Sequence, residues 1–312
     1  MRELCIPAFA KINSCLEIIG KRPDGFHEIR TIFQSVSLHD EVRLKSTRTA
    51  AITLNVVGNR SLSREPVENN LVYRAVQALR QALKIRTGVS IELKKNIPAG
   101  RGLGGGSSDA AAALLGFLRL TGKKASMAMF VEIAASLGAD VPFFLFGGRA
   151  LGIGKGDEIY PLADVAKQFF LVVSPGNIHV ATPDAYRWLA APQISLTPVR
   201  SSRKTPATLT KAAADHKLWK FCAFCWSTQE NGLSNDFEGP VFRRHARLAR
   251  IKRDLLQRGA TEASLAGSGS AVFGVFPSPA MARRAAVGFP HDQTFVCESI
   301  SRERYLRRFR SA

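Results

Sequence analysis

The sequence of 312 residues has few cysteines and no long apolar run. Its five cysteines are odd in number and scattered, which is typical of free thiols in a reducing compartment and predicts no structural disulfide. The apolar runs 141–146 and 169–173 are too short to cross a bilayer and are typical of buried strands. Glu3, Pro7 and Lys11 interrupt the first dozen positions, which argues against a signal peptide. We therefore expect a cytoplasmic protein without a membrane partner.

Acidic residues are scarce relative to basic ones. The chain has 25 Asp and Glu against 44 Lys and Arg, a formal net charge of +19. Such an excess occurs in nucleic-acid-binding proteins, but a positive field also attracts small anions such as nucleotides. The basic residues gather at 243–258 and 302–310 without aromatic residues at regular spacing, so a solvated surface is the simpler interpretation.

The two commonest nucleotide-binding signatures do not explain this chain. No Gly-x-x-x-x-Gly-Lys-Ser/Thr occurs, and no Gly-x-Gly-x-x-Gly follows an early strand with an acidic residue downstream. If the chain binds a nucleotide, a different fold is implied.

The stretch 97–116 is dense in glycine and runs into an alanine-rich helical pattern. Glycine allows positive φ and lets backbone N–H groups approach an anion. We expect Ser107 or Ser108 to cap a helix that ends at Gly122, with Asp109 in its first turn. A helix N-terminus directed into such a loop binds phosphate. The alternative is a flexible turn before an ordinary helix, but five glycines and two adjacent serines favour a phosphate loop.

Alternating and helical patterns predict the elements around this loop. Residues 11–18 alternate as a strand with Lys11 and Asn13 on one face, followed by a turn at 22–25 and a strand within 26–38. Pro142 ends a helix and is expected to hold Asp140 on a short connection. The other expected elements are strands at 51–57, 89–93, 143–146, 169–173, 263–265 and 271–276, and helices at 69–84, at 126–137, from Thr182 as N-cap, and around 243–258.

Four motifs stand in a recognisable order: 10–13, the glycine-serine loop, 138–142 and 267–270. Their order resembles that of the GHMP kinase superfamily, over nearly the whole chain. The resemblance implies an α+β, two-domain GHMP kinase fold. A ribosomal-protein-like N-terminal domain would span 1–163, with the ATP phosphate loop and the catalytic residues, and a ferredoxin-like C-terminal domain would span 164–312. An insertion at about 191–220 and a basic tail at about 301–312 fall outside the resemblance, at places where length variation is tolerated.

Within the superfamily, 24–27 and 235–238 resemble kinases that phosphorylate the 2-hydroxyl of a cytidine diphosphate conjugate of methylerythritol, in the non-mevalonate isoprenoid pathway. The resemblance implies ATP as phosphoryl donor and Mg²⁺ as cofactor. It implies Asp140 as the catalytic base, with Lys11 as the catalytic cation that stabilises developing charge. For the ATP phosphates it implies Pro98, Ala99, Gly100, Arg101, Gly102, Leu103, Gly104, Gly105, Gly106, Ser107 and Ser108, with the Ser107 hydroxyl as a metal ligand. For the acceptor it implies Asn13, Phe26, His27, Asp140, Gly267 and Ser268.

Two residues depart from the family pattern. Phe26 stands where Tyr is frequent, and Arg101 stands where a small residue is common. Arg101 either contacts phosphate or projects to solvent, and the sequence leaves both open. Other acceptors within the superfamily, as in homoserine or mevalonate kinases, are an alternative, and a basic nucleic-acid-binding protein is another. We expect a small-molecule substrate, no nucleic acid, and a monomer or weak homodimer.

Overall fold

The computed structural model describes residues 3–189 and 232–307. The expected insertion at 191–220 and the last residues of the expected basic tail lie outside the described residues. No helix within the described ranges is long and apolar enough to cross a membrane.

A seven-stranded sheet carries the first half of the chain. Strands β1 (Glu3–Lys21) and β2 (His27–Thr47) form a long antiparallel hairpin at its centre. The order continues on one side to β4 (Gly88–Lys94) and β3 (Ile52–Val57), and on the other to the short β8 (Ser234–Asn235). Strand β5 (Arg149–Ile153) pairs with β2 and with β6 (Glu158–Pro161).

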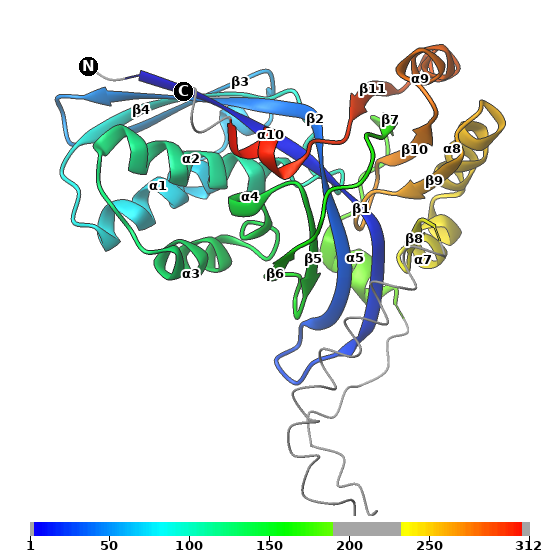
Figure 1. The fold of residues 1–312 in the computed structure, drawn as a ribbon, viewed down its shortest axis with the longest axis horizontal. Helices are drawn as coiled ribbons and strands as arrows, with labels where there is room; N and C mark the ends of the chain where they lie inside the picture. Colours follow the sequence, from blue (N-terminus) through cyan, green and yellow to red (C-terminus); the bar gives the residue numbers. More distant parts are fainter. Residues whose placement is uncertain (1–2, 190–231, 308–312) are drawn as a thin grey trace, which may run out of the picture.

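Helices cover one face of this sheet (Figure 1). They are α1 (Leu71–Ala82), α2 (Gly105–Thr121), α3 (Met127–Leu137) and α4 (Phe143–Phe146), and two short 3₁₀ turns, Leu62–Arg64 and Val67–Asn69, precede α1. Helix α1 buries an apolar stripe at helical spacing, and the Asn70 side chain caps it by accepting the Val72 N–H. In α2 the four consecutive alanines 110–113 are fully buried, so this helix lies close to the sheet.

The second half of the chain builds an antiparallel sheet of four strands. Their order is β11 (Gln293–Glu298), β7 (Phe169–Ser174), β10 (Val272–Phe276) and β9 (Glu262–Leu265). Among its described residues, this half contains the helices α5 (Thr182–Arg187), α7 (Glu238–Arg244), α8 (Ala246–Gln257) and α9 (Pro279–Ala286). The last helix, α10 (Arg302–Arg307), returns to the first half, where Tyr305 is fully buried in the core. The predicted boundary between 163 and 164 falls between β6 and β7, and it stays a prediction.

Most predicted elements are present. The strands at 51–57 and 89–93 and the helix at 69–84 are confirmed as β3, β4 and α1. Helix α3 has Ser126 as its N-cap and Gly138 as its C-cap, and α2 ends at Gly122 in the left-handed conformation, as the capping patterns predict.

The predicted strand at 143–146 is wrong, because this run is helix α4. Pro142 has helical dihedral angles (φ −56°, ψ −37°) and starts the helix, instead of leaving the chain extended. A short apolar run does not distinguish a buried strand from a buried helix, and Phe143, Phe144 and Leu145 are all buried.

Three helix starts also differ from the prediction. Helix α2 begins at Gly105 with the left-handed Gly104 as N-cap, so neither Ser107 nor Ser108 caps it. Helix α5 has Ala181 as N-cap, and Thr182 instead contacts the Ser268 hydroxyl. The basic segment around 243–258 forms two helices, because the non-helical backbone of His245 (φ −129°, ψ +69°) separates α7 from α8.

Candidate active site

The segment 97–106, here called the phosphate loop, connects β4 to α2 and takes left-handed backbone at Gly100, Gly102 and Gly104. At Gly102 (φ +80°) an added Cβ would lie 1.8 Å from the carbonyl oxygen of Ala266, so only glycine fits this approach. At Gly104 (φ +70°) an added Cβ would lie 2.8 Å from the Phe144 ring. The loop delivers the N-terminal end of α2 to a cavity, which is the arrangement that binds anions.

The cavity has a volume of about 1180 Å³ and collects residues from both halves of the chain. The predicted site residues on its wall are Lys11, Asn13, Phe26, His27, Pro98, Ala99, Gly100, Arg101, Gly102, Leu103, Gly104, Gly105, Gly106, Ser107, Asp140, Gly267 and Ser268. Ser108 is the exception. It is fully buried in α2 and does not line the cavity, and its role in phosphate binding stays a prediction.

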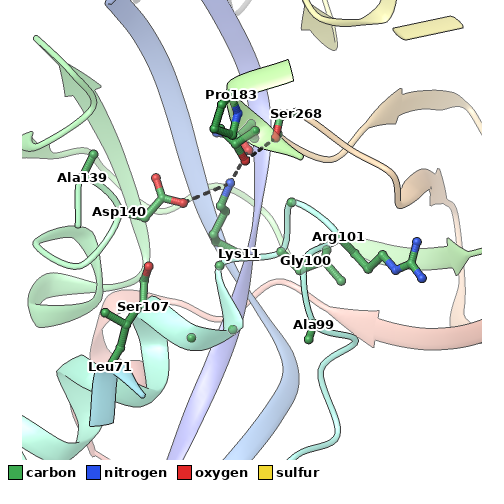
Figure 2. A pocket seen from close by; sticks show the side chains of 18 of the residues that line it. Lys11, Leu71, Ala99, Gly100, Arg101, Ser107, Ala139, Asp140, Pro183 and Ser268 are labelled. Carbon is green, nitrogen blue, oxygen red and sulfur yellow. Dashed lines mark hydrogen bonds and ion pairs between the residues drawn. The ribbon is translucent and has the colours of Figure 1, made fainter. Parts of the chain in front are cut away.

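Lys11 and Asp140 form an ion pair beside the phosphate loop (Figure 2). The Lys11 Nζ lies 3.6 Å from Asp140 Oδ2, and the lysine side chain is only 4% exposed while the aspartate is 36% exposed. The backbone N–H of Lys11 donates to the Leu103 carbonyl (3.0 Å), which ties β1 to the phosphate loop. A cation is thereby held in a fixed place while the carboxylate faces the cavity.

Asn13 fixes the direction of the Lys11 side chain. Lys11 Nζ donates to Asn13 Oδ1 (2.8 Å), and Asn13 Nδ2 donates to Thr31 Oγ1 (2.7 Å). The predicted shared face of Lys11 and Asn13 is therefore confirmed. The Thr31 hydroxyl donates in turn to the Cys15 carbonyl (2.7 Å), so each polar group of this buried row has a partner.

The other end of the cavity is aromatic. The His27 ring stacks on Tyr186 of α5, with centroids 4.7 Å apart, and Tyr186 meets Phe237 edge to face. Phe26 is 57% exposed, and Lys155 Nζ lies 4.9 Å from its ring centroid. Burial and the charge of Lys21 lower the pKa of His27, which favours a neutral imidazole at neutral pH.

Tyr186 was missed by the sequence reasoning, although it follows Pro183 by one helical turn in a predicted helix. Burial and the nearby Asp140 carboxylate raise its pKa to about 12, so the phenol keeps its proton. Its position beside His27 depends on a contact between α5 and the start of β2, which lie far apart in the sequence, so no local pattern reveals it.

The 267–270 segment, here called the second glycine loop, lies against the phosphate loop. A Cβ on Gly267 would lie 3.1 Å from the Gly102 carbonyl oxygen and 3.2 Å from Lys11 Nζ. Asn235 holds this loop, because its Nδ2 donates to the Gly267 and Leu265 carbonyls (both 2.8 Å). Asn235 of the 235–238 motif therefore holds the second glycine loop in place.

A buried charge cluster that the sequence reasoning missed lies behind the phosphate loop. Lys95 Nζ contacts both Asp40 and Asp109, the latter at 2.6 Å. Burial lowers the pKa of Lys95, but the two carboxylates outweigh it and the net shift is upward. Burial raises the pKa of Asp109 to about 8, against the opposing charge of Lys95. The ion pairs of Lys95 thus connect the residue that follows β4 to β2 and to α2.

Arg101 does not project freely into solvent, and a contact with phosphate stays a prediction. Its side chain extends away from the Lys11–Asp140 pair (Figure 2) and hydrogen-bonds to Ser270 and to the Gly176 carbonyl. Among the described residues no group of three or more His, Cys, Asp or Glu side chains is arranged to hold a metal ion. Oxygen donors that line the cavity near the phosphate loop include the Ser107 hydroxyl and the carboxylates of Asp109 and Asp140.

Comparison with known proteins places this geometry in a family. The GHMP kinases N terminal domain matches residues 70–148, and the GHMP kinases C terminal domain matches 218–290. A 4-diphosphocytidyl-2-C-methyl-D-erythritol kinase of Solibacter usitatus is 42% identical over 100% of this chain and 93% of its own length. The kinase of the same name from Thermodesulfovibrio yellowstonii is 34% identical, over 90% of this chain and 93% of its own.

Solved structures support the same family assignment. A crystal structure of 4-(cytidine 5'-diphospho)-2C-methyl-D-erythritol kinase superposes with a TM-score of 0.72 at 32% identity, covering 95% of this chain and 99% of that one. A homoserine kinase from Cytophaga hutchinsonii shares the fold (TM-score 0.66, 96% and 95% covered) at only 20% identity. The chain therefore belongs to the 4-diphosphocytidyl-2-C-methyl-D-erythritol kinase family of the GHMP kinases.

Proposed function

We propose that this protein transfers the γ-phosphoryl group of ATP to the 2-hydroxyl of 4-diphosphocytidyl-2-C-methyl-D-erythritol, a step of the non-mevalonate route to isoprenoid precursors. The observation that carries this proposal is the Lys11–Asp140 pair, which lies between a phosphate loop and an aromatic recess in one cavity. Family membership supports the choice of acceptor.

The phosphate loop and the N-terminal end of α2 would bind the phosphates of ATP. Backbone N–H groups that point into the cavity, together with the positive end of the helix dipole, favour a polyanion there. The Ser107 hydroxyl, in the first turn of α2, adds a polar group on the same wall.

Asp140 would act as the general base. Its partly exposed carboxylate takes the proton of the acceptor hydroxyl as that oxygen bonds to the γ-phosphorus and the bond to the ADP oxygen breaks. Lys11, held by Asn13, supplies a fixed positive charge where negative charge develops. Since Lys11 is buried, its charge is screened little by water.

The aromatic recess would bind the cytosine ring of the acceptor. His27 and Phe26 come from the start of β2 and the turn before it, and Tyr186 comes from α5. A neutral His27 has one ring nitrogen that donates and one that accepts, which suits the polar edge of a base, while aromatic faces suit stacking. Phe26 lacks a hydroxyl but keeps the stacking surface.

The donor set fits Mg²⁺. This ion is usually held by one or two protein oxygens plus substrate phosphates and water, so the lack of a larger ligand group among the described residues does not conflict with it. Ser107 would be its ligand, with Asp140 as a carboxylate on the same cavity wall. When bound, the ion would neutralise phosphate charge.

We further propose a cytoplasmic monomer or weak homodimer whose substrates are small molecules and not nucleic acid. Cys5, Cys15 and Cys297 are free thiols, which suits a reducing compartment. The positive charge of the chain would then attract its anionic substrates.

The test is ADP release from Mg²⁺·ATP with the cytidine diphosphate conjugate, run beside homoserine and mevalonate. We expect turnover with the conjugate alone, and a loss of about 10²-fold or more in kcat for Asp140→Asn with ATP binding retained, because the amide cannot accept the proton. Turnover with homoserine or mevalonate would assign another acceptor. Folded protein that binds ATP but turns over none of the three would refute the proposal.

A further inference from the structure

The guanidinium of Arg101 connects the phosphate loop to two segments of the second half of the chain. Its Nη1 donates to Ser270 Oγ (2.7 Å) and its Nη2 donates to the Gly176 carbonyl (3.1 Å). The Arg101 carbonyl also accepts the N–H of Ala271 (3.2 Å). Arg101 is thus tied to the second half through both its main chain and its side chain.

The partner hydroxyl is itself fixed. Ser270 is fully buried, and its Oγ donates to the Ile178 carbonyl (2.7 Å) while it accepts from Arg101. With both roles filled, the hydroxyl cannot rotate to follow a moving guanidinium without losing a bond in a buried place. The Arg101 side chain therefore sets a defined distance between the phosphate loop and the second glycine loop.

The two loops also touch through their backbones beside this link. Gly102, the next residue along the phosphate loop, approaches Ala266, and Gly267 approaches both Gly102 and Lys11 Nζ. A shift of the second glycine loop would therefore change the surroundings of the catalytic cation as well as those of the phosphate loop.

We propose that Arg101 is a positioning residue, which locks the phosphate loop to the second glycine loop and so sets the placement of the ATP phosphates relative to the Lys11–Asp140 pair. This inference rests on the proposed function for the identity of the nucleotide. Arg101 acts through Ser270, and its guanidinium is not required to touch phosphate. The backbone bond from Ala271 remains when the side chain is replaced, so the fold is retained while the loop loosens.

The experiment measures ATP binding by calorimetry with a non-hydrolysable analogue, and steady-state kinetics, for Arg101→Met, Ser270→Ala and the double variant. A displacement of reacting groups by about 1 Å costs on the order of a hundredfold in rate, so we expect a loss of ten- to a hundredfold in kcat/KM for ATP in Arg101→Met. Ser270→Ala should reproduce most of this loss, and the double variant should lose no more than Arg101→Met. Arg101→Lys, which can still reach the hydroxyl, should recover part of it.

Arg283→Met is the matched control, because it removes one exposed arginine from α9, in the second half of the chain. It should bind the analogue and turn over as the unaltered protein does. If the losses of Arg101→Met and Ser270→Ala multiply in the double variant, Arg101 acts independently of Ser270 and the proposal is wrong. It is also wrong if Arg101→Met changes only the urea midpoint, without a change in nucleotide binding or kcat.

If Arg101→Met does not fold, Ser270→Ala alone tests the proposal, because it removes the hydroxyl and leaves the guanidinium in place: an unchanged kcat/KM for ATP would refute it. If the enzyme does not turn over the proposed acceptor, this test still holds, because binding of the ATP analogue is measured without any acceptor. A failure of the Arg101 proposal, with turnover of the cytidylated acceptor retained in the unaltered protein, leaves the proposed function intact.

Discussion

Removal of the Lys95 charge should destabilise the protein strongly. The side chains of Lys95, Asp40 and Asp109 are 4%, 0% and 3% exposed, so none can exchange its partner for water. Asp40 keeps the N–H groups of Asn96 (2.5 Å) and Ile97 (2.8 Å) after Lys95→Met, whereas Asp109 Oδ1 has no hydrogen-bond partner among the described residues. The variant thus leaves Asp109 as a buried carboxyl without a compensating charge.

The expected cost is about 3–5 kcal/mol, the usual range for one partner deleted from a buried ion pair. Since whole proteins are stable by about 5–15 kcal/mol, this is a large share of the total. Lys94→Met is the control, because Lys94 is adjacent in sequence, is 52% exposed and pairs with Glu41 at the surface. Its loss should be about 0–1 kcal/mol.

Urea titration followed by circular dichroism measures both variants. The defect of Lys95→Met should shrink as pH falls, because the pKa of Asp109, already raised to about 8 by burial, rises further without Lys95 and protonation removes the unpaired charge. In the unaltered protein the raised pKa of Lys95 contributes stability that is complete below its ordinary pKa of 10.5 and is lost as pH rises through the higher folded value. Equal losses in Lys94→Met and Lys95→Met, or no rescue by adding Asp109→Leu to Lys95→Met, would refute the reasoning.

Two further variants test other parts of the structure. His27→Ala removes a ring stacked on Tyr186. It should raise the KM for the cytidylated acceptor at least about tenfold and leave the KM for ATP unchanged. Equal effects on both substrates would contradict the proposal that the aromatic recess binds cytosine. Tyr305→Phe removes the 2.7 Å hydrogen bond to the Phe144 carbonyl and should lower the free energy of unfolding by about 1 kcal/mol with kcat unchanged; an unaltered urea midpoint would show that this bond is replaced by another.

Local patterns predicted much of the fold because they act over a few residues. Caps such as Asn70, Ser126 and Gly138 mark helix ends wherever the chain goes next. The run 143–146 has no period of its own, and its helical form follows from packing against β2 and α2. The predicted start of α2 was misplaced because the left-handed backbone of Gly104 begins the helix at Gly105, before either of the two serines that could have capped it.

The Lys11–Asp140 pair, the glycines of the phosphate loop and the place of His27 on the cavity wall could be predicted because motifs carry them. Tyr186 and the pair of Lys95 with Asp40 could not, since their partners lie far away in sequence: 55 residues separate Lys95 from Asp40. The role of Arg101 depends on a partner 169 residues further on. Such contacts arise only when segments far apart in the sequence have folded together.

Helix α10 completes the core of the first half from the far end of the sequence. Ile300, just before it, donates its N–H to the Ser35 carbonyl (2.8 Å) and accepts from the Gln34 side chain (3.1 Å), and Tyr305 packs beside Phe9 and Phe144. A ribosome makes these residues after the strands and helices that they complete. During synthesis the core of the first half therefore stays incomplete beside β2 until residues 300–307, made much later, pack against it.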